Sequence, residues 1–159
     1  MGNKFLKQYF LLSLLLSSTL FLSQTKRINL IILNDREISK SIYDVTLKPI
    51  NDDSVVSPII GKYVPGDLVL ESKDFDKLLF SNSKDFEMSF TAISTVNPNL
   101  VKQTNYKVII PKIYLNDEYL ILNIFNMYNK VSKKKYHKLI NNDKEYYVII
   151  ESPNSMKFN

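Results

Sequence analysis

Hydrophobic and polar residues alternate along several short segments of this chain. The most regular alternation lies at residues 86–92, where Phe, Met, Phe and Ala are separated by Glu, Ser and Thr. Residues 43–47 show the same alternation, and residues 28–33 form an apolar run interrupted only by Asn29. A period of two is typical of strands with one buried face, and a short apolar run is typical of strands buried on both faces. We therefore predict β-strands in all three segments.

Turn residues separate the strand-like segments at short intervals. Four short sequences favour turns: Pro65-Gly66, Asn97-Pro98-Asn99, Asn116-Asp117 and Asn141-Asn142-Asp143. We expect the last two of these to close hairpins. Further strands are predicted at residues 55–64, 68–70, 106–110, 113–115, 118–129, 136–140 and 146–150.

Only one segment shows a helical period. Residues 73–80 place Phe75, Leu78 and Leu79 on one face, and Ser72 stands where it can cap the helix. The pattern as a whole predicts an all-β fold, an antiparallel β-sandwich of about 7–9 short strands with at most one short helix. A small open barrel is the alternative architecture. Cysteine is absent, so packing alone must stabilise the fold.

The first 24 residues have the layout of a secretory signal. Lys4 and Lys7 precede an apolar run at residues 10–22, which ends before Lys26. This run is shorter than the roughly 18–20 residues that a membrane-spanning helix needs. We therefore predict a signal helix at residues 1–24 and a single β-sandwich domain at residues 25–159, exported to the periplasm, the cell surface or the medium. The alternative is an uncleaved membrane anchor formed by residues 10–22.

The predicted order of strands between residues 27 and 151, together with the sequence GKYVPGDLVLE at residues 61–71, resembles a known class of exported modules. These are the transthyretin-like or carboxypeptidase-regulatory-like β-sandwich modules of bacteria. The resemblance implies a non-catalytic accessory or binding module. It includes no diagnostic motif and therefore assigns no role to an individual residue.

Residue types that are rare or missing exclude several kinds of site. Glycine occurs only at positions 2, 61 and 66, which rules out phosphate-binding loops, dinucleotide fingerprints and the nucleophile elbow of hydrolases. Because His137 is the only histidine and cysteine is absent, cysteine- or histidine-rich metal sites are excluded as well. We expect no cofactor, no metal and no catalytic residue.

Neighbouring carboxylates leave one enzymatic alternative open, a small exported hydrolase. Four pairs are close in sequence: Asp52-Asp53, Asp74 with Asp76, Asp85 with Glu87, and Asp117-Glu118. A glycosidase needs two carboxyl groups about 5–10 Å apart across a cleft. The competing interpretation places these carboxylates in solvated loops and strand edges.

Lysines and tyrosines concentrate in the last third of the chain. The candidate binding residues are Lys133, Lys134, Lys135, Tyr136, Tyr146 and Tyr147. Clustered cations attract anionic partners, and exposed tyrosines stack on sugars or anchor proteins. We therefore predict a non-catalytic binding or structural module of the cell envelope, whose partner is an anionic envelope component, a polysaccharide or another envelope protein. The alternative is structural, with lysines protecting an edge strand from aggregation and tyrosines packing within a sheet.

Nucleic acid is not among the expected partners. Only two of the 21 basic residues are arginines, and the formal net charge is +5. Removal of the predicted signal lowers that charge by two, since Lys4 and Lys7 leave with it. Nucleic-acid-binding domains usually show a concentrated arginine and lysine face.

Overall fold

A computed structural model describes residues 24–51, 57–97, 100–139 and 144–158. The predicted signal at residues 1–24 therefore lies outside the described residues, apart from Gln24. The predicted turn at residues 141–143 and the carboxylate pair Asp52-Asp53 lie outside them as well. No helix in the described part of the chain is long and apolar enough to span a membrane.

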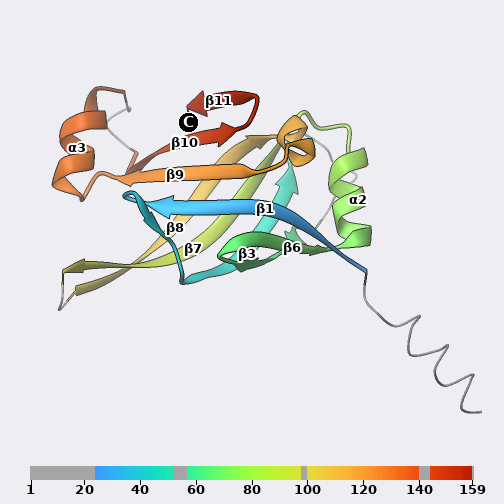
Figure 1. Ribbon diagram of the computed structural model, residues 1–159, viewed down its shortest axis with the longest axis horizontal. Coiled ribbons are helices and arrows are strands. Elements are labelled where there is room, and N and C mark those ends of the chain that lie inside the picture. The colour runs from blue at the N-terminus through green and yellow to red at the C-terminus, as the bar shows by residue number, and fades with distance from the viewer. Residues whose placement is uncertain (1–23, 52–56, 98–99, 140–143, 159) are drawn as a thin grey trace, which may run out of the picture.

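The described strands form two sheets, which lie one behind the other in Figure 1. The seven-stranded sheet has the order β11-β10-β9-β1-β6-β5, with β2 paired to β1. Its strands are β1 (Thr25–Asn34), β2 (Glu37–Ile38), β5 (Lys62–Val64), β6 (Gly66–Glu71), β9 (Leu120–Asn126), β10 (Tyr146–Ser152) and β11 (Ser155–Phe158). The four-stranded sheet has the order β4-β3-β7-β8. Its strands are β3 (Ile42–Pro49), β4 (Ile59–Ile60), β7 (Asp85–Asn97) and β8 (Leu100–Pro111).

The main hydrophobic core lies between the two sheets. The alternating apolar residues of β7, among them Phe86, Met88 and Phe90, are buried there as predicted. Leu30 of β1 and Leu122 of β9 belong to the same core from the other sheet. The mostly β, sandwich-like fold expected from the alternation of polar and apolar residues is thus confirmed.

Strand number and direction differ from the prediction. The described chain has eleven strands instead of about 7–9, and some of them, such as β4, are only two residues long. The larger sheet is mixed, because β1 runs parallel to β9 between Leu30–Leu120 and Asn34–Ile124. A parallel pair needs a long connection. Here that connection contains the whole four-stranded sheet.

The hairpin predicted at Asn116-Asp117 is wrong. Pro111 ends β8, and the next residues form a 3-10 helix, Lys112–Asn116. This helix carries the chain from one sheet to the other, since β9 pairs with β1 and β10 and not with β8. Tyr114 and Leu115 are buried in the core as part of this helix. The apolar character of the segment therefore reflects core packing and not a strand.

The predicted helix is present as α2 (Ser72–Phe80). Leu78 is its buried residue, and Phe75 packs against the main core. Ser72 does not cap the helix, because its hydroxyl donates to the carbonyl of Gln24 at 2.6 Å. The residue that precedes the helix is Glu71, and it makes no capping hydrogen bond with its side chain.

A second α-helix, α3 (Lys130–Tyr136), replaces the strand predicted at residues 136–140, and His137–Leu139 continue it as a 3-10 turn. The prediction of at most one short helix is therefore wrong. Two local causes favour the helix. Asn129 caps it by accepting from the N–H groups of Val131 at 3.0 Å and Ser132 at 3.4 Å. Ser132 and Tyr136, four residues apart, form its buried face.

Candidate binding surface

The helix α3 presents a group of lysines to solvent. We call these residues the lysine face; all five side chains are exposed: Lys130, Lys133, Lys134, Lys135 and Lys138. The ion pairs found among the described residues lie elsewhere and include none of these lysines. The lysine face is therefore a concentration of positive charge without a carboxylate partner in the described part of the chain.

The spacing of these lysines is only partly favourable to the helix. Lys130 and Lys134 are four residues apart in α3, and like charges at this spacing destabilise a helix. Lys133 to Lys135 lie in the last turn, where cations interact favourably with the carbonyl end. An anion bound to this face would relieve the repulsion and preserve the favourable interaction.

Polar contacts hold the inner side of α3 in place. The Ser132 hydroxyl donates to Asp35 Oδ1 at 2.6 Å. Asp35 belongs to the turn between β1 and β2, where it and Arg36 both have positive φ, as in two-residue hairpins of type I′. Asp35 also accepts from the N–H of Asn126 at 3.0 Å and from Asn126 Nδ2 at 2.9 Å. One carboxylate thus connects α3, β9 and the β1–β2 turn.

A buried polar network continues from Asp35 into the sandwich. Asn126 is 1% exposed, and its Oδ1 accepts from the Tyr106 hydroxyl at 2.6 Å. Asn126 Nδ2 also donates to Asn34 Oδ1. Burial raises the pKa of Tyr106 well above its ordinary value, with a smaller contribution from Tyr128. Because Tyr106 lies in β8 and Asn126 in β9, the network joins the two sheets beneath α3.

An aromatic stack holds the rest of α3. The ring centroids of Phe125 and Tyr136 lie 4.4 Å apart, those of Tyr136 and Tyr147 lie 5.4 Å apart, and those of Tyr147 and Phe158 lie 6.4 Å apart. Phe125, Tyr136 and Tyr147 form, together with Met127 and Ile149, a second, small hydrophobic cluster that is separate from the main core. Burial, followed by the neighbouring Tyr136, raises the pKa of Tyr147. The stack packs α3 against the face of the larger sheet that points away from the main core.

Tyr146 lies on the opposite face of β10 and connects the two sheets. Its hydroxyl accepts from the N–H of Lys107 at 2.8 Å and donates to the carbonyl of the same residue at 3.0 Å. Its ring packs edge-on against Tyr106, with 4.9 Å between the centroids. Since β8 pairs only with β7, Tyr146 satisfies backbone groups on the free edge of that strand.

The structure therefore brings five of the six predicted site residues together, in different environments. Lys133, Lys134 and Lys135 are exposed on α3, whereas Tyr136 and Tyr147 are buried beneath it. Tyr146 lies apart, at the interface between the sheets.

Sequence reasoning missed a polar groove beside the N-terminal end of α3. The groove has a volume of about 640 Å³, and its lining includes Asn34, Asp35, Glu37, Tyr128, Asn129 and Lys130. The Lys102 ammonium lies 4.1 Å from the centroid of the Tyr128 ring. The only local signal for this groove was the sequence Asn34-Asp35-Arg36, which is typical of a turn.

A larger groove of about 870 Å³ lies beside α2, and it differs in its charges. Lys73 pairs there with Glu71 at 2.8 Å, and Lys77 pairs with Asp74 at 2.7 Å. The hydrogen bond to Glu71 raises the pKa of Lys73. The charges of this groove are thus balanced within the protein.

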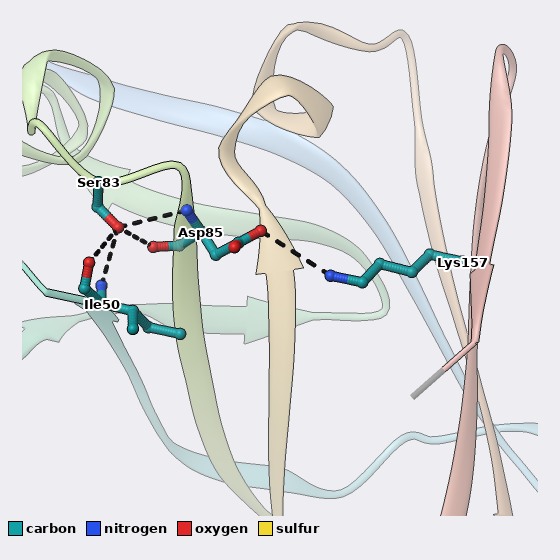
Figure 2. A network of polar contacts seen from close by, with 4 residues as sticks. All are labelled: Ile50, Ser83, Asp85 and Lys157. Atoms are coloured by element: carbon teal, nitrogen blue, oxygen red, sulfur yellow. Dashed lines mark hydrogen bonds and ion pairs between the residues drawn. The ribbon is translucent and has the colours of Figure 1, made fainter.

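The carboxylate pairs that suggested a hydrolase have partners of other kinds. Asp85 pairs with Lys157 at 3.9 Å, while its backbone is held by Ser83, which also contacts Ile50 (Figure 2). Glu87, two residues further along β7, pairs with Lys107 at 3.6 Å.

The other candidates for metal or acid–base chemistry are also engaged or exposed. The Asp117 carboxylate accepts from Asn154 Nδ2 at 3.2 Å. His137 is exposed, and its Nδ1 lies 2.9 Å from the carbonyl of Lys133. No group of three or more histidines, aspartates or glutamates suited to a metal ion occurs among the described residues.

Comparison of the chain with known proteins adds no family to this picture: no family model, curated protein or solved structure matches it.

Proposed function

We propose that this protein is an exported, non-catalytic binding module of the cell envelope, and that its lysine face binds an anionic partner. The observation that carries the proposal is the exposed group of five lysines on a firmly held helix, without carboxylate partners among the described residues. Two features of residues 1–24 support export: the positive charges of Lys4 and Lys7, and the apolar run at residues 10–22 that follows them.

Two further considerations favour binding through this face. A cationic patch raises the local concentration of anions and the rate of encounter with them. The contacts of Ser132 and Tyr136 hold α3 before any partner arrives, so little conformational entropy is lost on binding. The likeness of the predicted strand order to transthyretin-like modules is in line with a binding role.

Charge reversal tests the lysine face. The variant Lys133→Glu/Lys134→Glu/Lys135→Glu should bind immobilised dextran sulfate, a soluble polyanion, at least about tenfold more weakly than the unaltered protein. The control variant Lys26→Glu/Lys62→Glu/Lys84→Glu changes the net charge equally at exposed lysines on other elements, and should bind almost as well as the unaltered protein. Equal weakening in both variants would show that net charge matters and that the lysine face does not.

Cell fractionation with intact-mass measurement and N-terminal sequencing tests export. A soluble extracytoplasmic product that begins between about Leu20 and Thr25 is expected for a cleaved signal. A membrane-bound product that retains residues 1–22 would show instead that the module is tethered. A cytoplasmic product would contradict the envelope role.

A further inference from the structure

The lysine face includes apolar side chains that a purely electrostatic surface does not need. Val131 is 69% exposed, and it lines a shallow depression together with Lys130, Lys134 and Lys135. Val131, Lys134 and Lys135 follow the spacing i, i+3, i+4 of one face of α3, and Lys138 lies in the 3-10 turn that continues the helix. Leu139, directly after Lys138, is 65% exposed. The exposed side of residues 130–139 therefore carries two apolar side chains in addition to the five lysines.

This combination distinguishes between kinds of anionic partner. A sulfated or phosphorylated polymer in solution attracts lysines but gains nothing from Val131 or Leu139. A lipid surface offers anionic headgroups above an apolar layer, and segments that lie in that boundary carry lysines around an apolar patch. No ion pair among the described residues includes a lysine of this face, so its positive charge is not neutralised by a carboxylate there.

The position of α3 in the fold suits contact with a flat surface. Figure 1 shows α3 at one end of the long axis, away from α2 at the other end. Its buried side is held by the Ser132–Asp35 hydrogen bond and the aromatic stack, so its outer side is presented in a fixed orientation.

We propose that residues 130–139 dock on the surface of an anionic lipid bilayer, with the lysine face at the headgroup phosphates and Val131 and Leu139 at the boundary with the acyl chains. The inference rests on the proposed function, because it names the anionic partner of the same lysine face. It requires contributions of two kinds, one electrostatic and one apolar, and these can be removed separately.

Vesicle sedimentation tests both contributions in the purified protein, in the form that N-terminal sequencing identifies. The probes are vesicles of phosphatidylglycerol and phosphatidylcholine in equal parts, vesicles of phosphatidylcholine alone, and dextran sulfate. We expect binding to the mixed vesicles and little to phosphatidylcholine alone. Reversal of Lys133, Lys134 and Lys135 should weaken binding to the mixed vesicles at least about a hundredfold, because the loss of each positive charge alone accounts for about fivefold.

The apolar contribution is tested with Val131→Ser/Leu139→Ser, which leaves the charge unchanged and alters only exposed side chains. This variant should bind the mixed vesicles about tenfold more weakly and dextran sulfate as before. The matched control, Ile60→Ser/Phe80→Ser, removes two equally exposed apolar side chains beside α2 and should leave vesicle binding unchanged.

Other outcomes separate the inference from the proposed function. Binding to dextran sulfate but not to the mixed vesicles would overturn the lipid inference and leave the proposed function intact. Full vesicle binding by Val131→Ser/Leu139→Ser would also overturn it, because the apolar contact would then be absent. Equal binding of every variant to both kinds of vesicle would assign membrane attachment to residues 10–22 and overturn the inference. Binding to none of the probes would contradict both proposals.

Discussion

The two α-helices in the described part of the chain are similar in length but differ in the partners of their charged side chains and in the core that buries their inner sides. In α2, Lys77 pairs with Asp74, Lys73 pairs with Glu71 just before the helix, and Leu78 enters the main core. In α3, no acidic residue accompanies the lysines, and Tyr136 enters a separate aromatic cluster. Carboxylates of the protein itself thus neutralise both lysines of α2. By contrast, α3 is held on its inner side by Ser132 and Tyr136, and its outer lysines form no ion pair among the described residues.

The largest expected effect concerns the buried side of α2. Leu78→Ala removes a side chain from the main core and should lower the free energy of unfolding by about 3 kcal/mol. Urea denaturation followed by circular dichroism measures this loss. Phe80→Ala, at an exposed position of the same helix, is the control and should change stability by less than about 0.5 kcal/mol. Equal losses in both variants would contradict the assignment of Leu78 as the anchor of α2.

Alkaline pH should act more strongly on the α3 end than on α2, which contains no tyrosine and whose Lys73, although its pKa is raised by Glu71, is exposed to solvent. Burial raises the pKa of Tyr106 and of Tyr147 in the folded state, so the folded protein holds these protons more tightly than the unfolded chain. Stability is therefore unaffected below about pH 10 and falls as the pH rises above it. At about pH 11 we expect a loss on the order of 1 kcal/mol from Tyr106. Urea denaturation at a series of pH values measures it, and a constant free energy of unfolding across this range would contradict the prediction.

The polar anchor of α3 is tested by Asp35→Asn. Asparagine tolerates the positive φ of this position but provides one acceptor oxygen in place of two and carries no charge. We expect a loss of about 1–2 kcal/mol, because Asp35 accepts from both Ser132 and Asn126. Hydrogen exchange should show weaker protection in α3, with α2 unchanged. A uniform loss of protection over both helices would contradict a local role.

The smallest expected effect concerns salt. Raising the ionic strength screens the repulsion within the lysine face and the attraction in the ion pairs of α2. Hydrogen exchange should therefore become slower in α3 and faster in α2, each by a few tenths of a kcal/mol. A shift of the same sign in both helices would contradict the difference between repulsive charges in α3 and paired charges in α2.

The positions of most strands and of α2 were predictable because the signals for them are local. The alternation at residues 86–92 follows directly from one buried and one exposed face of β7. The period of residues 73–80 placed α2 within one residue of its start. The lysine cluster was visible in the sequence as a candidate site, but its secondary structure was not. Residues 136–140 include Tyr, Leu and Ile and resemble a strand, although Asn129 and the spacing of Ser132 and Tyr136 favour a helix.

The sequence by itself determined which segments are apolar on one side, where the chain turns and where positive charge gathers, since each of these depends on residues close together along the chain. Only the tertiary structure decided that β1 runs parallel to β9, that Tyr136 and Tyr147 stack under α3, and that Asp35 holds Ser132 from 97 residues away. Contacts of this kind depend on which sheet face meets which partner, and that choice comes from the packing of the whole chain. The same packing buries the inner side of α3 and thereby leaves the lysine face exposed on its outer side.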